Sequence, residues 1–294
     1  MKSFYSHFLI TRFNVRINTM LPKQLEQIDI TRNEQYLDER FRLFYKYTVP
    51  SVINQSSKKF TWILLFSSNT PIKYKNKLKQ LAKLKDIHIK ILYINDSDDY
   101  LMVLKNYIYS NLSTDYYITS RVDNDDCLSI NYMQNIQAYV DKMDYKHSVI
   151  IFNNGYQYDE LCKISTFYHF DTNHFSSLVS HIDDRDVIIE YNHMDINKFL
   201  PVINIDNSNP MWLEVVHNSN ITNRMHLKSD NFIYGKDLLK QFGLDIELQD
   251  LSKSRKTINI VMQKPKNFFR LYRQYGLKKC FKKFYEKFTK KFLR

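Results

Sequence analysis

The sequence predicts an α/β protein built on a mostly parallel sheet that is flanked by helices. In the first half of the chain, short apolar runs alternate with stretches whose apolar residues recur every three or four positions, which is the pattern of strands and helices in turn. The links between these stretches are short, as is typical of strand–helix–strand units. Residues 60–66 form a near-continuous apolar run, as expected for a strand covered on both faces.

The predicted elements follow in chain order. Strands are expected at residues 8–13, 60–66, 88–94, 116–122 and 147–152, and helices at residues 34–55, 71–84, 98–110 and 129–140. Pro50 predicts a kink in the first helix or the start of a second one. Pro71 suits the first position of its helix, and Ser97 suits the cap of the next. Further along the chain the periodicity weakens, and extended segments are expected at residues 161–170 and 187–191.

Glycine content excludes two common phosphate-binding loops. The 294 residues contain four glycines, which are isolated from one another: Gly155, Gly235, Gly243 and Gly276. Neither a P-loop nor a dinucleotide-binding fingerprint can be written with them. Any phosphate must therefore be held by a metal ion, by Lys or Arg side chains, or by helix N-termini.

Cysteine usage and hydropathy favour a cytoplasmic location. Cys127, Cys162 and Cys280 are odd in number and widely spaced, so neither a disulfide framework nor a zinc knuckle is indicated. The apolar run at residues 8–10 is too short for a signal-peptide core. A stretch of about 18 apolar residues, as a membrane-spanning helix requires, does not occur.

The net charge of +12 is concentrated in the last part of the chain. Residues 251–294 contain 15 Lys or Arg and one acidic residue, whereas residues 1–250 contain 28 Lys or Arg and 30 acidic residues. We therefore predict a globular domain over residues 1–250 and a basic tail over residues 251–294.

The tail is predicted to be a basic amphipathic helix. Its aromatic residues recur at helical spacing along one face: Phe281, Phe284, Tyr285, Phe288 and Phe292. Such a helix is attracted to an anionic membrane surface, here the inner face of the plasma membrane. A helix packed on the globular domain and a nucleic-acid-binding arm are the alternatives.

Three carboxylates follow the strand predicted at residues 116–122. Asp123, Asp125 and Asp126 would repel one another and lose hydration there unless a positive charge held them. A divalent cation that also bridges a diphosphate would hold them, with Asp123 and Asp125 as ligands and Asp123 also able to reach a ribose. Arg121 is a candidate for neutralising a phosphate or for pairing with an aspartate. The alternative is a solvated turn whose aspartates cap the next helix.

Two further groups of residues are candidates for the same site. In the Asn-rich stretch 209–224, His217 is a candidate metal ligand and Glu214 a candidate base, although a hydrogen-bonded strand histidine explains His217 equally well. At the end of the first strand, Thr11 and Arg12 are candidates for contact with a phosphate or a base.

Four segments of the chain resemble the bacterial putative rhamnosyltransferase family, which lies within the glycosyltransferases of the GT-A fold. The segments are Ile10-Thr11-Arg12-Phe13-Asn14-Val15; Glu39-Arg40-Phe41-Arg42-Leu43-Phe44 with Thr48-Val49-Pro50-Ser51-Val52 and Gln55; Ser120-Arg121-Val122-Asp123-Asn124-Asp125-Asp126; and Met211-Trp212-Leu213-Glu214-Val215-Val216-His217. Together they cover residues 6–225, but not the tail. Asn218 stands where this family often has glycine after the histidine.

The resemblance implies a GT-A-like (Rossmann-like) domain that transfers a sugar from a nucleotide donor to an acceptor hydroxyl. It implies Mn²⁺ or Mg²⁺ at Asp123 and Asp125, with Asn124 at the nucleotide. It also implies inversion at the sugar, with a carboxylate base for which the candidates are Glu214, Asp183, Asp184 and Asp186.

The sequence thus predicts a cytoplasmic, peripherally membrane-bound glycosyltransferase that acts on a glycan or lipid-linked acceptor in bacterial surface polysaccharide synthesis. A sugar nucleotidyltransferase is an alternative, but residues 11–17 lack the glycine-rich loop that such an enzyme usually has. A nucleic-acid-binding protein acting through the tail is the other alternative, and the charge of residues 1–250 argues against it.

Overall fold

The structure is a computed structural model that describes residues 5–15, 33–84, 86–217, 224–228, 230–235, 237–248 and 250–261. The chain divides into two compact units. The first unit comprises Met1–Gly155, His169–Leu213 and Leu239–Asp245. The second unit comprises Tyr156–Tyr168, Glu214–Leu238 and Ile246–Arg294.

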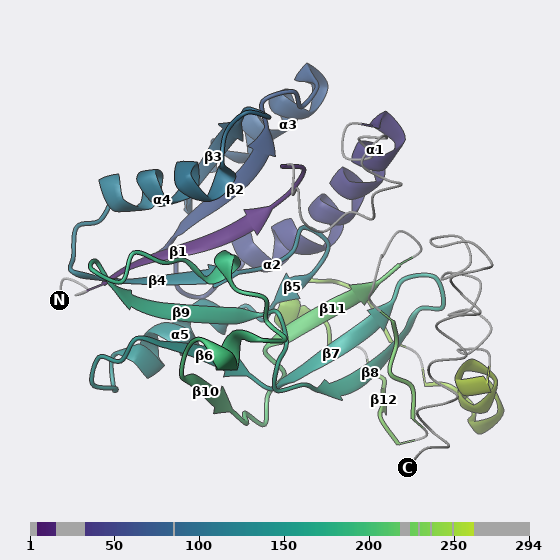
Figure 1. The fold of residues 1–294 in the computed structure, drawn as a ribbon. Helices are drawn as coiled ribbons and strands as arrows, with labels where there is room; N and C mark the ends of the chain where they lie inside the picture. Colours follow the sequence, from purple (N-terminus) through teal and green to yellow (C-terminus); the bar gives the residue numbers. More distant parts are fainter. Residues whose placement is uncertain are drawn as a thin grey trace, which may run out of the picture. The chain divides into compact units, whose positions relative to one another are not determined.

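A seven-stranded sheet runs through the first unit (Figure 1). In spatial order its strands are β10 (Val202–Ile205), β6 (Ser148–Phe152), β9 (Ser176–His181), β4 (Tyr116–Arg121), β1 (Tyr5–Arg12), β2 (Thr61–Ser67) and β3 (His88–Ile94). Neighbouring strands are parallel except that β9 runs antiparallel to both β4 and β6. The predicted α/β class with a mostly parallel sheet is therefore confirmed.

Helices pack on both faces of this sheet. They are α1 (Glu34–Leu43), η2 (Phe44–Thr48), α2 (Val49–Ile53), α3 (Ile72–Leu81), α4 (Tyr100–Ser110) and α5 (Tyr132–Val140). Leu104 of α4 joins a buried cluster with Ile10 and Ile63 on one face. On the other face Phe44 of η2 packs against Trp62, with ring centroids 5.6 Å apart. Successive side chains of β2 point to opposite faces of the sheet, so the strand contributes to a core on each face.

The predicted helix at residues 34–55 is present but is interrupted. Its middle, η2, is a π-helical turn that leads into Pro50 near the start of α2. Proline has no amide hydrogen to donate, so a local change of hydrogen-bond pattern at this point has a physical cause.

Two local predictions were wrong. Asp99, not Ser97, caps α4, because its carboxylate accepts a hydrogen bond from the Leu101 amide at 2.9 Å. The segment expected to be extended at residues 187–191 contains a 3₁₀ turn, η3 (Ile188–Glu190). Two other short 3₁₀ turns are η4 (Ile196–Lys198) and η5 (Lys240–Phe242).

Five short strands form a second sheet, in the order β12-β8-β7-β11-β5. They are β5 (Cys127–Leu128), β7 (Asn154–Asp159), β8 (Ile164–His169), β11 (Trp212–Val216) and β12 (Phe232–Ile233). In the first unit, β5 pairs antiparallel with the start of β11, Leu128 opposite Trp212. In the second unit, β12 pairs antiparallel with β8, Phe232 opposite Thr166.

The predicted basic tail falls mostly outside the described residues. Residues 253–261 are helical, and residues 262–294, which carry the predicted aromatic face, are not among those described. In the part of the chain that the structure describes, no helix is long and apolar enough to cross a membrane.

Strand direction decides which residues can meet at the edge of the large sheet. Because β1 and β4 are parallel, with Ile10 opposite Arg121, the residues that follow both strands emerge at the same edge. Because β9 is antiparallel to β4, with Ser177 opposite Ser120, the residues that precede β9 reach that edge as well. Ligands on parallel sheets bind beyond this carboxyl edge.

Candidate metal and phosphate site

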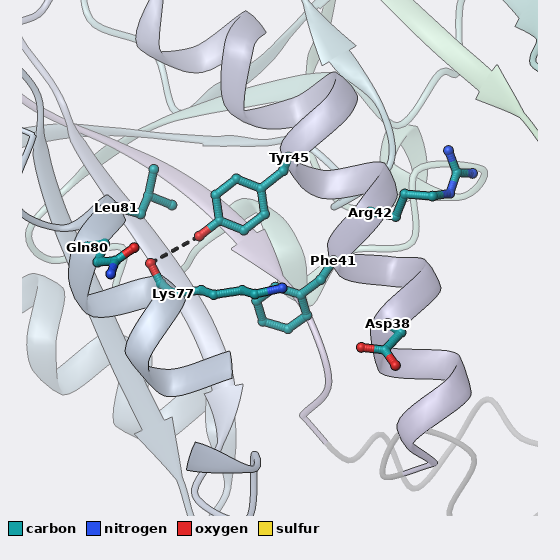
Figure 2. A pocket seen from close by; sticks show the side chains of 7 residues that line it. All are labelled: Asp38, Phe41, Arg42, Tyr45, Lys77, Gln80 and Leu81. Atoms are coloured by element: carbon teal, nitrogen blue, oxygen red, sulfur yellow. Dashed lines mark hydrogen bonds between the residues drawn. The ribbon is translucent and has the colours of Figure 1, made fainter. Parts of the chain in front are cut away.

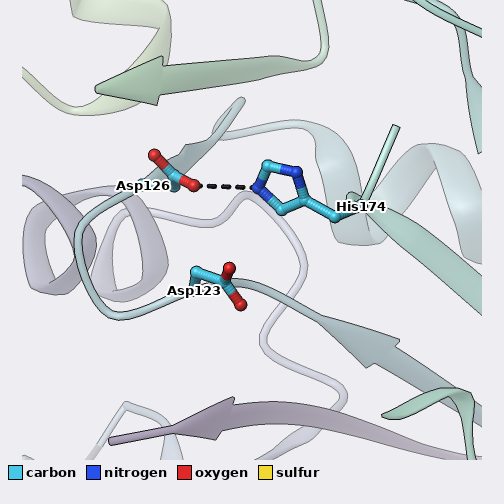
Figure 3. Close-up of side chains that lie close together, drawn as sticks. All are labelled: Asp123, Asp126 and His174. Atoms are coloured by element: carbon cyan, nitrogen blue, oxygen red, sulfur yellow. Dashed lines mark hydrogen bonds and ion pairs between the residues drawn. The ribbon is translucent and has the colours of Figure 1, made fainter. Parts of the chain in front are cut away.

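Three side chains that can ligate a metal ion converge at the carboxyl edge of the sheet (Figure 3). One ligand atom each from Asp123, Asp126 and His174 lies within 4.8 Å of the other two. His174 Nε2 is 2.9 Å from Asp126 Oδ2. The Asp126 side chain is 1% exposed and the Asp123 side chain is 44% exposed, so the group is open to solvent on the Asp123 side.

Each of the three aspartates in the segment directly after β4 has a positively charged side chain beside it. The pairs are Arg121 with Asp123 at 3.5 Å, Arg40 with Asp125 at 2.8 Å, and His174 with Asp126 at 2.9 Å. These pairs lower the repulsion among three neighbouring acids at the end of a buried strand.

The pKa values reflect this mutual neutralisation. The partial desolvation of Asp123 alone would raise its pKa, but the charges of Arg121, His174 and Arg12 outweigh it and hold the pKa well below the ordinary range. Burial alone would lower the pKa of His174, but its hydrogen bond with Asp126 and the charge of Asp123 raise the pKa to about 8. His174 is therefore mostly protonated at neutral pH, and a metal ion at its ring nitrogen must displace that proton.

The structure groups Asp126, rather than the predicted ligand Asp125, with Asp123. The Asp125 carboxylate is directed to Arg40 on α1, where Nη1 of the guanidinium donates to Oδ2. The D-x-D spacing predicted Asp123 and Asp125 as partners, but the turn that ends β4 brings the next residue to the shared point instead.

Arg12 and Arg121, the candidates for contact with a phosphate, lie beside Asp123. Both contribute to the low pKa of Asp123, so their charges are near its carboxylate. Arg12 Nη1 also lies 3.4 Å from the Tyr100 hydroxyl. The two guanidinium groups supply positive charge at the sheet edge where an anion would enter.

Two predicted nucleotide-contact residues have their side chains engaged within the protein. The Thr11 side chain is buried, and its Oγ1 accepts a hydrogen bond from the Trp62 indole at 3.0 Å. The Asn124 amide nitrogen donates to the carbonyl of Arg12 at 3.0 Å, and its Oδ1 accepts from Arg40. Both side chains therefore have partners within the protein, and their roles in ligand contact stay predictions.

Asp184, a predicted base, is not brought to the cluster. It follows β9, whose last residue His181 pairs with Tyr116 at the start of β4, whereas Asp123 follows the other end of β4. There the Asp184 carboxylate accepts hydrogen bonds from the Tyr145 hydroxyl and the His181 amide.

The other predicted residues belong to the second unit. Glu214 is 9% exposed on β11 and its Oε2 accepts a hydrogen bond from Gln157 Nε2. His217 is 6% exposed and follows β11. Their proposed roles as base and metal ligand stay predictions.

Two histidines near Asp123 were not among the predicted site residues. His174 precedes β9, and the ring of His193 lies 5.8 Å from the His174 ring. Burial, with the nearby charges of His174 and Arg121, lowers the pKa of His193 to about 4. Strand β9 brings His174 to the sheet edge, but its serine-rich sequence did not predict a strand.

A pocket of about 400 Å³ lies between α1, η2 and α3 (Figure 2). It is lined by Asp38, Phe41, Arg42, Tyr45, Lys77, Gln80 and Leu81. The Tyr45 hydroxyl donates to the Lys77 carbonyl at 3.1 Å across it. None of the lining residues belongs to the group of Asp123, Asp126 and His174.

Comparison with solved structures gives weak similarities. Staphylococcus aureus TarS 1–349 is 9% identical with a TM-score of 0.40, and the alignment covers 71% of this chain and 60% of that one. A putative nucleotide-diphospho-sugar transferase from Desulfovibrio desulfuricans G20 is 9% identical with a TM-score of 0.35, over 72% and 83% of the two chains. The inositol-1-phosphate CTP transferase of T. maritima is 8% identical with a TM-score of 0.37, over 75% and 93%. At these values no fold or activity is transferred from them.

Comparison by sequence is more decisive. No curated protein matches the chain. The model of the family described as putative rhamnosyl transferase matches residues 6–229, which is most of the chain and includes the whole carboxyl-edge cluster. The chain therefore belongs to the putative rhamnosyl transferase family.

Proposed function

We propose that the protein is a metal-dependent glycosyltransferase of GT-A-like fold that moves a sugar, for which rhamnose is the candidate, from a nucleotide-diphosphate donor to a hydroxyl of a glycan or glycolipid acceptor. The observation that carries the proposal is the convergence of Asp123, Asp126 and His174 at the carboxyl edge of the sheet. Family membership supports sugar transfer as the reaction class.

The donor set fits a divalent cation. Two carboxylates and one imidazole, with ligand atoms within 4.8 Å of one another, are compatible with Mn²⁺ or Mg²⁺. The imidazole favours Mn²⁺, since Mg²⁺ prefers oxygen ligands. When bound, such a cation would supply charge neutralisation to the diphosphate leaving group.

The chain's own residues have separable tasks in this proposal. Asp123 and Asp126 would hold the cation, and His174 would join them in its neutral form. Arg12 and Arg121 attract the diphosphate and stabilise the negative charge it gains as the bond to the sugar breaks. The acceptor hydroxyl loses its proton to a carboxylate base, for which Glu214 is one of the candidates that the sequence supplies. Inversion at the sugar belongs to the same proposal.

The acceptor and its location complete the proposal. A lipid-linked glycan in bacterial surface polysaccharide synthesis would be reached by a peripheral protein whose basic tail, residues 251–294, binds an anionic membrane surface. Co-sedimentation with anionic vesicles tests this part. A protein truncated after residue 250 that still co-sediments would refute it.

The central experiment measures thermal stabilisation of the purified protein by a panel of nucleoside diphosphates, with and without Mn²⁺. We expect one nucleotide to raise the melting temperature only when Mn²⁺ is present, because a ligand that binds the native state stabilises it. Asp126→Asn should abolish the Mn²⁺-dependent shift, and Asp144→Asn, at an exposed carboxylate, should leave it unchanged. Equal shifts with and without Mn²⁺, or a full shift in Asp126→Asn, would refute the proposed site.

A further inference from the structure

The helical run from α1 to α2 holds the loop after β4 along one face. Polar side chains on this face bond to the segment that begins at Asp123, and they are Arg40, Thr48, Ser51 and Gln55. Arg40, Thr48 and Ser51 belong to the helical run, and Gln55 follows it two residues after α2 ends. Ser51 Oγ accepts from the Leu128 amide at 3.3 Å, and Gln55 Nε2 donates to the Ser129 carbonyl at 2.7 Å.

Further contacts tie the same loop to the helical run. The Cys127 thiol donates to the Tyr47 carbonyl at 3.3 Å. The other end of the Gln55 amide accepts from the Met133 amide at 3.0 Å, at the start of α5. The backbone that follows β4 is therefore held by contacts with the helical run as well as by its own turn, in which the Asp126 amide donates to the Asp123 carbonyl at 3.2 Å.

Arg40 is the residue of this face that reaches the acidic side chains themselves. Its side chain is 12% exposed, Nη1 lies 2.8 Å from Asp125 Oδ2, and Nη2 donates to Asn124 Oδ1. Asn124 in turn donates to the backbone carbonyl of Arg12. One guanidinium thus connects α1, the loop after β4 and the end of β1.

The geometry favours a holding role over contact with a ligand. Both terminal nitrogens of Arg40 are engaged with Asp125 and Asn124, and Arg40 Nε is buried with no hydrogen-bond partner among the described residues. A buried guanidinium with one unpaired donor is costly, so the ion pair and the Asn124 bond must offset that cost.

We infer that Arg40 is a positioning residue, which binds Asp125 and Asn124 so that the neighbouring Asp123 and Asp126 converge with His174 on the metal ion. This inference rests on the proposed function for its metal, but the ordering of the loop by Arg40 does not depend on that metal. In this arrangement Asp125 acts through Arg40 and is not itself a ligand.

The experiment compares Arg40→Met with Arg42→Met in the full-length protein. Arg42 lies on the same helix and pairs with Glu39 on the surface, so it is a matched control. Two quantities are measured: the affinity for Mn²⁺ alone, by electron paramagnetic resonance, and the hydrogen exchange of amides 123–129 in metal-free protein. Arg40→Met should weaken Mn²⁺ binding by about 10–100-fold, as loss of a group that orients metal ligands typically does, and should speed the exchange.

Two further variants distinguish positioning from a general loss of folding. Arg40→Lys keeps the charge but lacks the second nitrogen, so it should restore part of the Mn²⁺ affinity. Arg40→Met/Asp125→Asn removes both members of the buried pair, so it should be more stable than Arg40→Met while Mn²⁺ binding stays weak.

The outcomes separate this inference from the proposed function. If the wild-type protein binds no Mn²⁺, the proposed function fails. Independently of that result, unchanged hydrogen exchange of amides 123–129 in Arg40→Met would overturn the inference. Wild-type Mn²⁺ affinity in folded Arg40→Met would also overturn it. Normal Mn²⁺ affinity with loss of nucleotide binding would make Arg40 a direct phosphate ligand and would likewise overturn positioning.

Discussion

The indole of Trp212 lies parallel to the Phe175 ring, with centroids 4.9 Å apart and planes 10° apart. Phe175 directly follows His174, and its backbone carbonyl accepts a hydrogen bond from the Tyr132 hydroxyl at 3.0 Å. The stack and this hydrogen bond fix the backbone that carries His174. The candidate metal site is therefore supported by aromatic packing beneath it.

Gly155→Ala should disturb this stack. A Cβ at Gly155 would lie 2.1 Å from Trp212 Cδ2, so the indole would have to move. We expect destabilisation by about 1–3 kcal/mol, the usual cost of overpacking a core, and weaker Mn²⁺ binding through His174. Urea unfolding and Mn²⁺ titration measure the two effects. Adding Trp212→Phe makes room, so the double variant should be more stable than the sum of the two single effects predicts, and strict additivity would contradict this account.

His174 predicts a loss of stability in alkaline, metal-free protein. Its pKa of about 8 in the folded state exceeds the ordinary 6.5, so its contribution is complete below pH 6.5 and is lost as the pH rises through 8. The contribution is about 2 kcal/mol from the size of this shift. Urea unfolding in the presence of a chelator, at pH 6 and at pH 9, measures it. His174→Gln should remove most of the difference, and a variant with the wild-type pH dependence would show that another group is responsible.

His7 predicts a loss of stability on the acid side. It is buried between Ser120 and Gln137, and burial lowers its pKa to about 3. Because the unfolded chain binds the proton near pH 6.5 and the folded one does not, stability is full above pH 6.5 and falls as the pH is lowered towards 3. At pH 5 the loss is about 2 kcal/mol. Urea unfolding of wild type and His7→Gln at pH 7 and pH 5 tests it, and equal losses in both proteins would refute it.

Asp186→Asn should cost stability without affecting metal binding. The buried Asp186 carboxylate accepts hydrogen bonds from Ser180, His147 and Tyr191, at 2.7–2.9 Å. Replacing a charged acceptor of this kind costs about 1–3 kcal/mol. Urea unfolding should therefore show a lower free energy of unfolding, whereas Mn²⁺ titration should show an unchanged affinity. The control is Asp183→Asn at a highly exposed carboxylate, and a large loss of Mn²⁺ affinity in Asp186→Asn would contradict the assignment.

The elements that the sequence predicted well are those whose residues are recognisable locally. The apolar run at residues 60–66 corresponds to β2, and the strand at residues 88–94 corresponds to β3. In β2 burial requires apolar side chains at successive positions, and that requirement is visible without knowledge of neighbours. Strand β3 lies at the edge of the sheet, where Ile89 and Ile94 are buried and His88 is exposed.

Strand β9 was not predicted because several of its buried residues are serines, whose hydroxyls hydrogen-bond within the protein. Ser177 bonds to Ser120 on the neighbouring strand at 2.6 Å, and Ser180 bonds to Asp186. A buried strand in which three of six residues are serine leaves only a weak apolar pattern. His174, which depends on β9 for its position, could not be found for the same reason.

The sequence named Asp123, Arg12 and Arg121 as candidates for one site, but it did not group Asp126 and His174 with Asp123. The choice between Asp125 and Asp126 depends on Arg40, a residue 85 positions away from Asp125 along the chain. No local spacing encodes such a contact.

The hydrogen bond of Cys127 to the Tyr47 carbonyl has a practical consequence. This thiol sits one position beyond Asp126, is fully buried, and has a pKa that burial raises well above the ordinary value. The thiol is thus unreactive while the segment that carries it stays packed against the helical run that contains Tyr47. The rate at which an alkylating reagent modifies Cys127 would report how often the helical run and the acidic segment separate. The protein therefore contains an internal probe of local opening at its candidate site.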